Sequence, residues 1–344
     1  MRRRQRVLAC ALAGLGLVAA VLAGTTYGAV SIPWRHLVGI LAHAAGLPVT
    51  PDWPAWEATV LLHVRLPRVL VGLCVGGGLA LCGAALQALF RNPLADPGVL
   101  GVSSGAALGA VIALYLGLAA HSVWPLPILA CGSAGLTAFV VYGIATRRGQ
   151  TPIGTLLLAG VAVGSLNAAL TSFVLSLSLA NFDIGRQLIL WLLGGLDGRT
   201  WEHVKLVAPI TLLAAGLIIA YARDLDVLLL GDVHAASVGV DVVRVRRVLI
   251  IGTALVTGVG VAVSGVIGFV GLIIPHILRR LIGPHHQWLL PLAVVVGAAF
   301  LVFADCLARA LIAPEELRLG VLTALIGAPF FLFLLLRHRR EGLL

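Results

Sequence analysis

Residues 86–110 read LQALFRNPLADPGVLGVSSGAALGA, a proline-containing polar stretch that separates two long apolar runs. Pro93 has no amide hydrogen to continue a helix, so we expect the preceding helix to end before it. Asp96 followed by Pro97 is typical of an N-cap with proline in the first turn, which predicts that a new helix begins there. The stretch therefore predicts a tight turn between two helices.

The helix expected after this turn has small residues at several positions. They are Gly101, Ser103, Ser104, Gly105 and Gly109. Small side chains let two helix backbones approach closely inside a membrane. We expect this face to contact a neighbouring helix.

The composition indicates a polytopic membrane protein of the all-α class. Of the 344 residues, 60% are hydrophobic and only 11% are charged, whereas a soluble domain has about 25% charged residues. Apolar runs long enough to cross a bilayer recur along the chain. We predict about ten spans, near 7–30, 58–90, 98–118, 122–146, 152–180, 203–222, 242–266, 268–282, 288–311 and 319–337.

Three apolar segments differ in length or flanking residues from an ordinary membrane span. Residues 1–24 have the basic start of a signal peptide, but the apolar part reaches from Val7 to about Val30, which favours a first span. The second span, 58–90, would be about 50 Å long and must tilt or project from the bilayer. The segment FDIGRQLILWLLGGLDG, residues 182–198, is too short to cross and is predicted to be a re-entrant or surface helix.

The distribution of basic residues predicts the orientation. With the N-terminus inside, 16 of the 24 Lys and Arg residues fall in cytoplasmic segments, among them Arg147 and Arg148. The positive-inside rule then places both termini in the cytoplasm. The net charge of +10 fits contact with anionic membrane lipid. Because the basic residues are scattered over separate loops, no nucleic-acid partner is expected.

We find no catalytic or metal-binding pattern in the sequence. The five cysteines form no CxxC pair, and no Walker A motif is present. We therefore predict that the chain has no catalytic residue, no metal ligand and no cofactor of its own, and that it is not an enzyme.

The segment RLPRVLVGLCVGGGLALCGAALQALFRNPLADPGVLGVSSGAALGA, residues 65–110, closely resembles the signature of the FecCD-type permeases. Three further segments agree in order: LILWLLGGLDGRTWEHV, LLLGDVHAASVGVD, and VSGVIGFVGLIIPHILRRLIGPHH followed by ADCLARAL. Members of this family are membrane subunits of bacterial ABC importers for ferric siderophores, haem and cobalamin.

The resemblance implies a type II ABC importer permease fold, with residues 1–344 as a single transmembrane domain in the bacterial inner membrane. It also implies four kinds of partner: a second copy of the chain in a homodimer, two ATP-binding cassette subunits that carry the ATP and Mg, a periplasmic substrate-binding protein, and membrane lipid.

Residues 228–247, LLLGDVHAASVGVDVVRVRR, form a cytoplasmic connection between the sixth and seventh spans. Asp232 is predicted to cap a short helix, and Gly239 to end it in a left-handed conformation. The resemblance implies that this is the coupling helix docked on the ATPase, with Gly231, Asp232, Ala235, Ala236 and Gly239 at the contact. An ordinary amphipathic loop helix is the alternative.

On the outer face, Arg65, Arg68 and Arg309 match family positions that pair with acidic residues of the binding protein. Arg65 and Arg68 could instead anchor their helix at the membrane interface. Arg309 has a local competitor, because Asp305 lies four residues earlier on the same helix face.

The resemblance also implies a cytoplasmic gate at Asn92 and Leu94, with the start of the fifth span near Ile153 and Gly154 on its other side. It implies a pathway along the fifth span (Ser165, Asn167 and Thr171), the short Gln187–Gly195 helix, the eighth span and the tenth span. Asn167 could instead make a structural hydrogen bond between helices. A pathway with few charged groups suits a bulky, mostly neutral chelate.

The sequence therefore predicts the permease subunit of an ATP-driven importer for an iron chelate. A ferric siderophore is the leading substrate, haem the second and cobalamin the third. A secondary transporter driven by an ion gradient is the rival from another class, but it predicts charged residues at mid-membrane, which are almost absent here.

Overall fold

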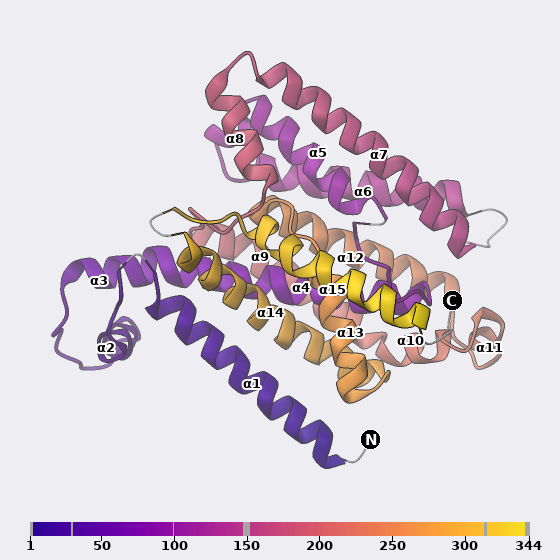
Figure 1. Cartoon of the computed structure of the whole chain (residues 1–344), viewed down its shortest axis with the longest axis horizontal. Coiled ribbons are helices and arrows are strands. Elements are labelled where there is room, and N and C mark those ends of the chain that lie inside the picture. The colour runs from indigo at the N-terminus through magenta and orange to yellow at the C-terminus, as the bar shows by residue number, and fades with distance from the viewer. Residues whose placement is uncertain (1–2, 29, 99, 147–151, 313–314, 341–344) are drawn as a thin grey trace.

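The structure is a computed structural model that describes residues 3–28, 30–98, 100–146, 152–312 and 315–340. Within these ranges the regular structure is entirely helical (Figure 1). The helices are α1 (Arg3–Thr26), α2 (Trp34–Ala44), α3 (Ala55–Thr59), α4 (Leu66–Leu89), α5 (Val102–Tyr115), α6 (Pro125–Ala145), α7 (Ile153–Ser178), α8 (Phe182–Leu192), α9 (Trp201–Ala220), α10 (Ala222–Leu228), α11 (Asp232–Ser237), α12 (Val242–Ser264), α13 (Val270–Ile282), α14 (His286–Leu311) and α15 (Leu319–Arg340).

The predicted spans are found as helices. Among the described residues, seven helices are long and apolar enough to cross a membrane. The longest joins α3, a π-helical turn over Val60–Arg65 and α4 into 35 residues, Ala55–Leu89, which confirms the unusually long second span. The shorter apolar helices are α5 and the Leu319–Phe333 part of α15, and α13 has 13 residues. The short segment after the fifth span forms α8, as predicted.

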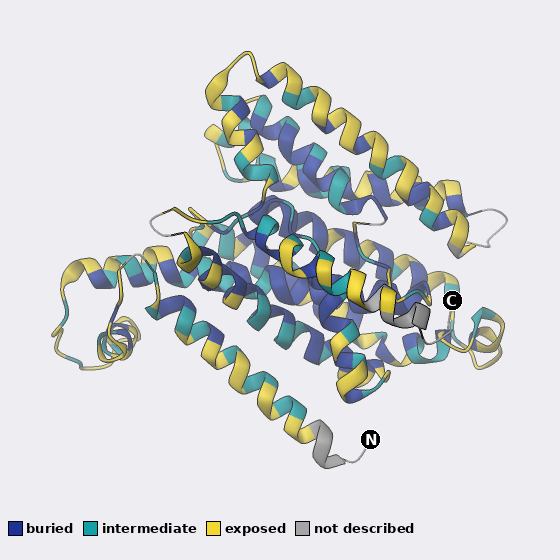
Figure 2. Cartoon of the chain, viewed as in Figure 1, coloured by how far each residue is buried: buried dark blue, intermediate teal, exposed yellow. Residues whose placement is uncertain are grey.

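Helix α4 lies at the centre of the molecule and packs against α9, α12, α13 and α14 (Figures 1 and 2). Glycines make this close packing possible. A Cβ on Gly76 would lie 2.4 Å from the carbonyl oxygen of Gly297 in α14, and a Cβ on Gly83 would lie 2.0 Å from that of Gly271 in α13. Any side chain at these positions would force the helices apart.

Helices α5, α6 and α7 pack against one another, and α5 and α6 also contact α12. The predicted small-residue face of α5 makes the α6 contact. A Cβ on Gly105 would lie 2.2 Å from the Thr137 hydroxyl, and one on Gly109 would lie 2.2 Å from the Leu129 carbonyl oxygen. The expected close approach is confirmed.

The turn between α4 and α5 differs from the prediction in one respect. Helix α5 begins at Val102 after Gly101, whose φ is 73°, so Asp96 is not its N-cap. Asp96 instead accepts a hydrogen bond from the amide of Gly98 at 2.8 Å. An Asp side chain that bonds the backbone two residues later stabilises a turn and competes with helix initiation. Burial raises the pKa of the Asp96 carboxyl.

The molecule has two distinct ends (Figure 1). The first and last described turns lie toward the same end as α10 and α11, whereas α2, α3 and α8 lie toward the other. This arrangement agrees with an even number of crossings. Among the 16 basic residues of the predicted cytoplasmic segments, Arg2 near the N-terminus and the pair Arg147 and Arg148 lie outside the described residues.

Replacement of Gly76 by Ala tests the central packing. The new methyl group would overlap the backbone of α14, so we expect a loss of about 1–3 kcal/mol in stability. Gly143 in α6 is the matched control, because a Cβ there has no atom within 4 Å and alanine favours a helix. Thermal unfolding in detergent should show a lower transition for Gly76→Ala and an equal or higher one for Gly143→Ala. Equal transitions for the two variants would contradict the packing role of Gly76.

Candidate functional site at the two ends of the helices

At the end that contains α10 and α11, Asp232 links three helices. Its Oδ1 atom lies 2.5 Å from Arg91 just beyond α4, and its Oδ2 atom lies 2.8 Å from Arg246 in α12. The predicted capping role is wrong, since the N-cap position is held by Gly231 and no side-chain cap bond is made. The two ion pairs hold the carboxylate away from the helix terminus and fix α11 to α4 and α12.

The end of α11 agrees with the sequence analysis. Gly239 has a φ of 90°, its amide donates to the carbonyl of Ala236 at 3.1 Å, and the amide of Val240 donates to that of Ala235 at 3.0 Å. This pattern is a glycine-terminated helix end. Asp241 then caps α12 by accepting a hydrogen bond from the amide of Arg244 at 3.0 Å.

Helix α11 presents an apolar surface to its surroundings. Val233 is 83% exposed, Leu230 71% and Val238 68%. Ala236 is also exposed, whereas Ala235 is fully buried in the core of the chain. Ala235 therefore does not lie on the face available to a partner. The sequence analysis selected the small residues and missed the larger apolar ones that surround them.

The two residues of the predicted gate lie in the turn after α4. Asn92 accepts a hydrogen bond from the amide of Leu94 at 2.9 Å. Asn92 also lines a cavity of about 270 Å³ together with Arg91, Arg279 and His286. Leu94 is 42% exposed. Both residues are thus at the end of the molecule where a gate is expected.

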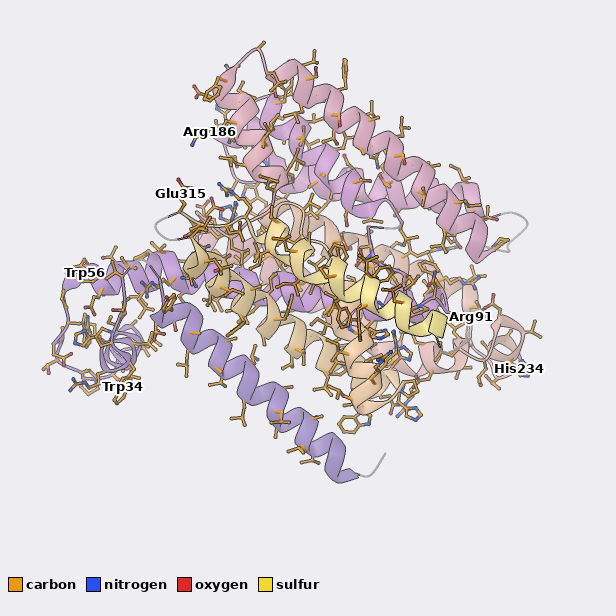
Figure 3. All side chains as sticks on the ribbon, viewed as in Figure 1. Trp34, Trp56, Arg91, Arg186, His234 and Glu315 are labelled. Carbon is orange, nitrogen blue, oxygen red and sulfur yellow. The ribbon has the colours of Figure 1, made fainter. Side chains whose placement is uncertain are left out.

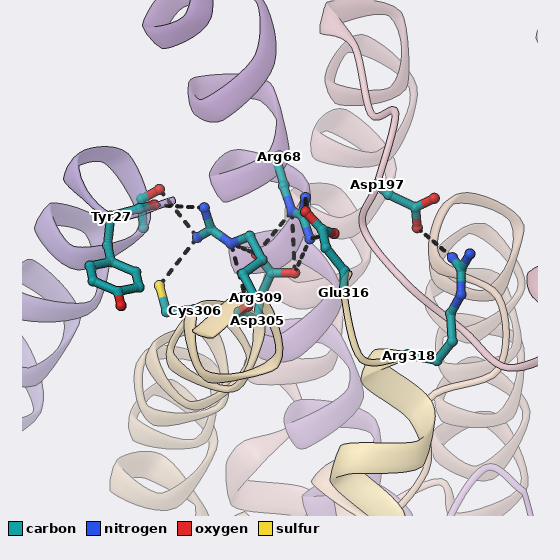
Figure 4. Close-up of polar contacts among 9 residues, drawn as sticks. Tyr27, Arg68, Asp197, Asp305, Cys306, Arg309, Glu316 and Arg318 are labelled. Atoms are coloured by element: carbon teal, nitrogen blue, oxygen red, sulfur yellow. Dashed lines mark hydrogen bonds and ion pairs between the residues drawn. The ribbon is translucent and has the colours of Figure 1, made fainter. Parts of the chain in front are cut away.

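At the opposite end, Arg68 and Arg309 surround a buried carboxylate (Figure 4). Arg68 lies 2.9 Å from Asp305 and 2.7 Å from Glu316. Arg309 lies 3.3 Å from Asp305, which confirms the pair expected within α14. The side chains of Asp305 and Arg309 are 5% and 7% exposed, and only Glu316, at 42%, is open to a partner.

Arg65 is also held within the chain. It is 5% exposed, and it donates hydrogen bonds to the backbone carbonyls of Thr25 at 2.9 Å and Thr26 at 2.7 Å and to that of Val30. The three carbonyls lie at the end of α1 and just after it, where a helix leaves acceptors unpaired. In this structure Arg65 anchors α1 to the long second span and is not a free surface charge.

Of the three residues expected along the pathway, Asn167 and Thr171 are buried and Ser165 is exposed. Asn167 in α7 is 7% exposed and donates to the hydroxyls of Thr137 in α6 at 3.0 Å and Ser104 in α5 at 3.4 Å. The hydroxyl of Thr171 donates to the carbonyl of Asn167 at 2.8 Å. The structural alternative for Asn167 is therefore the one observed, and only Ser165 is exposed.

A polar cavity, which we call the outer cavity, lies between α8, the loop before α9, the end of α12 and the start of α15. The sequence analysis placed the Gln187–Gly195 segment along the pathway but did not predict the arginines gathered here. The volume of the outer cavity is about 390 Å³, and Arg186, Gln187, Trp191, Arg199 and Arg318 are among its lining residues. Arg318 lies 2.9 Å from Asp197 (Figure 4). The sequence gives no local signal for this cavity, because its arginines come from three separate elements.

A fold with this many long apolar helices is that of a multi-pass membrane protein. The chain belongs to the FecCD transport family, whose model matches residues 15–337. Membership in this family makes it a multi-pass membrane protein and the permease subunit of an ABC importer.

Three similar proteins support this assignment. The chain is 44% identical over 309 residues to the cobalamin import system permease protein BtuC of Halobacterium salinarum, covering 88% of this chain and 79% of the relative. It is 39% identical to the hemin transport system permease protein HmuU of Yersinia pestis, covering 94% of each. A solved inward-facing metal-chelate type ABC transporter superimposes with a TM-score of 0.82 at 32% identity, covering 94% of this chain and 97% of the other.

Arg68→Gln tests the buried charge cluster. The change leaves Asp305 next to Glu316 with one cation fewer, so we expect a loss of about 3 kcal/mol or more in stability. Arg318→Gln is the control, because its partner Asp197 is 52% exposed and a surface pair contributes about 1 kcal/mol or less. Thermal unfolding of the two purified variants provides the comparison, and equal stabilities would show that the cluster is not structural.

Proposed function

We propose that this chain moves an iron chelate from the periplasm to the cytoplasm as half of a homodimeric permease driven by two separate ATPase subunits. The proposal is based mainly on the attachment and surface of the short helix α11. Asp232 fixes this helix to α4 and α12, and Val233 within it and Leu230 just before it are exposed. An apolar tip on a firmly attached helix suits contact with a second subunit.

The fixed attachment of α11 explains how ATP could drive transport. A helix held by ion pairs to the ends of two packed spans transmits a displacement to both of them. Closure of the ATPase subunits would then move the ends of α4 and α12 and change the access to the pathway, which is a rigid-body switch. ATP and Mg bind to the ATPase in this proposal, so the chain itself needs no cofactor and hydrolyses nothing.

The same arrangement supports an orientation in the bacterial inner membrane. The contact with the ATPase must be cytoplasmic, and both ends of the described chain lie toward the end that holds α11 (Figure 1). Both termini are therefore proposed to be cytoplasmic. Trp34 and Trp56, at the opposite end (Figure 3), are 70% and 47% exposed, in keeping with the aromatic residues enriched at membrane interfaces.

Helices α7 and α15 supply the proposed dimer contact. Leu158, Leu166 and Phe173 of α7 are 58–73% exposed, and Leu325 and Phe333 of α15 are at least 60% exposed. Helix α15 begins directly after Arg318 of the outer cavity, and α7 contains the exposed Ser165. A second copy against these two helices would enclose a central pathway in this proposal. The gate at Asn92 and Leu94 lies at its cytoplasmic end in this proposal.

A periplasmic substrate-binding protein is expected at the outer end. Docking by Arg65, Arg68 and Arg309 stays a prediction, but their contacts within the chain leave them available to a partner to different degrees. Arg68 shares the exposed Glu316, whereas Arg65 and Arg309 are already bonded to backbone carbonyls. Arg68 is therefore the most suitable of the three to exchange its partner for an acid of the binding protein.

Transport by a reconstituted complex tests the proposed function. We expect ATP-dependent uptake into proteoliposomes that contain this chain, its ATPase and its binding protein when a ferric siderophore, haemin or cyanocobalamin is supplied. The leading substrate is the siderophore, followed by haemin and then cyanocobalamin. Uptake of cyanocobalamin alone would overturn the iron-chelate substrate, and the absence of ATP-dependent uptake from a folded complex would overturn the proposal for these three classes.

The double change Val233→Asp and Ala236→Asp tests the coupling role of α11. Charging the exposed face should remove the apolar contact with the ATPase. A valine side chain that becomes buried in the complex contributes about 1.5–3 kcal/mol to the binding free energy, so its loss corresponds to at least a tenfold weaker association. We expect ATP-dependent uptake to fall at least tenfold while thermal stability is unchanged.

Ser237→Ala, an exposed substitution on the same helix, is the control for this experiment and should transport normally. Normal uptake by the double variant would contradict the docking of α11. Asp232 and Ala235 are not suitable sites for this test, because one links three helices and the other is buried.

A further inference from the structure

We propose that the outer cavity is a carboxylate-binding vestibule that selects anionic chelates at the entrance to the pathway. This inference rests on the proposed function and deepens it by naming the chemical class of the substrate. It also revises the expectation of a neutral cargo, since that expectation came from the few charged residues within the spans and did not include the loops.

The cavity brings together three guanidinium groups from distant parts of the chain. Arg186 comes from α8, Arg199 from the loop before α9 and Arg318 from the turn before α15. Figure 3 shows Arg186 at the outer end of the molecule. Two carboxylates, Asp183 and Asp197, also line the cavity, so the net charge of its ionisable lining is positive.

The two carboxylates do not neutralise the arginines evenly. Asp197 is paired with Arg318 at 2.9 Å, and although burial opposes ionisation, Arg318 and Arg199 hold the pKa of this carboxyl below its usual value. Arg186 is exposed and makes no ion pair with a described residue, and Asp183 is exposed as well. Arg318 is thus paired, whereas Arg186 and Arg199 form no ion pair with a carboxylate of the described residues.

Arg199 is the most informative of the three. Its Nε atom is buried and has no hydrogen-bond partner among the described residues, and its guanidinium makes one contact, 3.2 Å long, with the imidazole of His203. Burial, with a contribution from Arg68, lowers the pKa of Arg199 despite the presence of Asp197. Arg199 is partly buried, and a buried donor without a partner on a cation that has no ion pair is costly. A ligand that accepts hydrogen bonds would remove this cost.

A second buried polar atom in the lining has no hydrogen-bond partner among the described residues, and it is also a donor. The indole Nε1 of Trp191 is buried without an acceptor, and Trp191 lines the outer cavity together with Arg199. Gln187, Trp191 and Arg199 also line a neighbouring cavity of about 290 Å³ on the side of α5 and α6. The buried groups of this lining that have no hydrogen-bond partner among the described residues are therefore both donors, which favours an acceptor-rich ligand.

A carboxylate is the acceptor that guanidinium groups match best, because its two oxygens can accept two parallel hydrogen bonds from one arginine. Metal chelates with peripheral carboxylates, such as a haem with its propionates or ferric citrate, present such groups at their edges. The aromatic face of Trp191 can contact the apolar part of a macrocycle. The vestibule therefore fits an anionic chelate better than an uncharged one.

The test is the binding of haemin to the full-length chain in nanodiscs, followed by quenching of tryptophan fluorescence, with haemin dimethyl ester as the probe that lacks free carboxylates. We expect haemin to bind at least tenfold more tightly than the ester, and Arg186→Gln with Arg199→Gln to weaken haemin binding at least tenfold. Arg199→Lys should retain part of the affinity, because it keeps the charge but not the fork of donors. Arg35→Gln is the matched control, an exposed arginine of α2 outside the cavity.

Two further results would bear on the vestibule. Thermal stability of Arg199→Gln should equal or exceed that of the unmodified chain, since the change removes a partly buried cation that has no ion pair among the described residues. Equal binding of haemin and its ester, or unchanged haemin binding in the double variant, would overturn the proposal. Failure of ATP-dependent uptake in proteoliposomes would concern the proposed function instead, because the binding measurement needs neither ATPase nor binding protein.

Discussion

Backbone-to-backbone contact along α4 is the constraint on which the rest of the structure depends. In a membrane the surrounding lipid is as apolar as the helices, so burial of apolar surface provides little drive for association, and close packing must hold the helices together. Gly76 and Gly83 meet Gly297 and Gly271 at distances that exclude any side chain. Helix α4 is thereby held in a fixed relation to α13 and α14, which lie about 180 or more positions later in the sequence.

This rigid centre gives the two ends of the molecule a mechanical connection. At one end α11 is tied by Asp232 to the segment that follows α4 and to α12. At the other, Arg68 in α4 is tied to Asp305 in α14. Because α4 runs between these attachments without a break, a force applied at α11 reaches the outer end through packed helices and ion pairs, with little loss in flexible loops.

The sequence was sufficient for the helical class, the order of the spans, the long second span and the short helix α11 that ends at Gly239, because these depend on local hydrophobicity and turn residues. It failed where a contact joins distant residues. Asp232 has the local pattern of a cap, but Arg91, 141 positions earlier, and Arg246 take its carboxylate. Arg65 was likewise assigned to the outer surface, since its carbonyl partners in and after α1 cannot be recognised from spacing. For Asn167 the sequence left a pathway role and a hydrogen bond between helices open, and the structure shows the hydrogen bond.

The arginines of the outer end illustrate why residue type alone could not assign their roles. Arg65 and Arg309 have acceptors supplied by the chain itself, so their charge is used to hold helices together. Arg199 has a buried donor without an acceptor, although it lies in the same region and is chemically identical. A charge that the fold already satisfies stabilises the protein, and a charge that the fold leaves unsatisfied can be completed only by another molecule. The number of partners, which only the three-dimensional structure reveals, therefore separates the structural arginines from those available to a substrate.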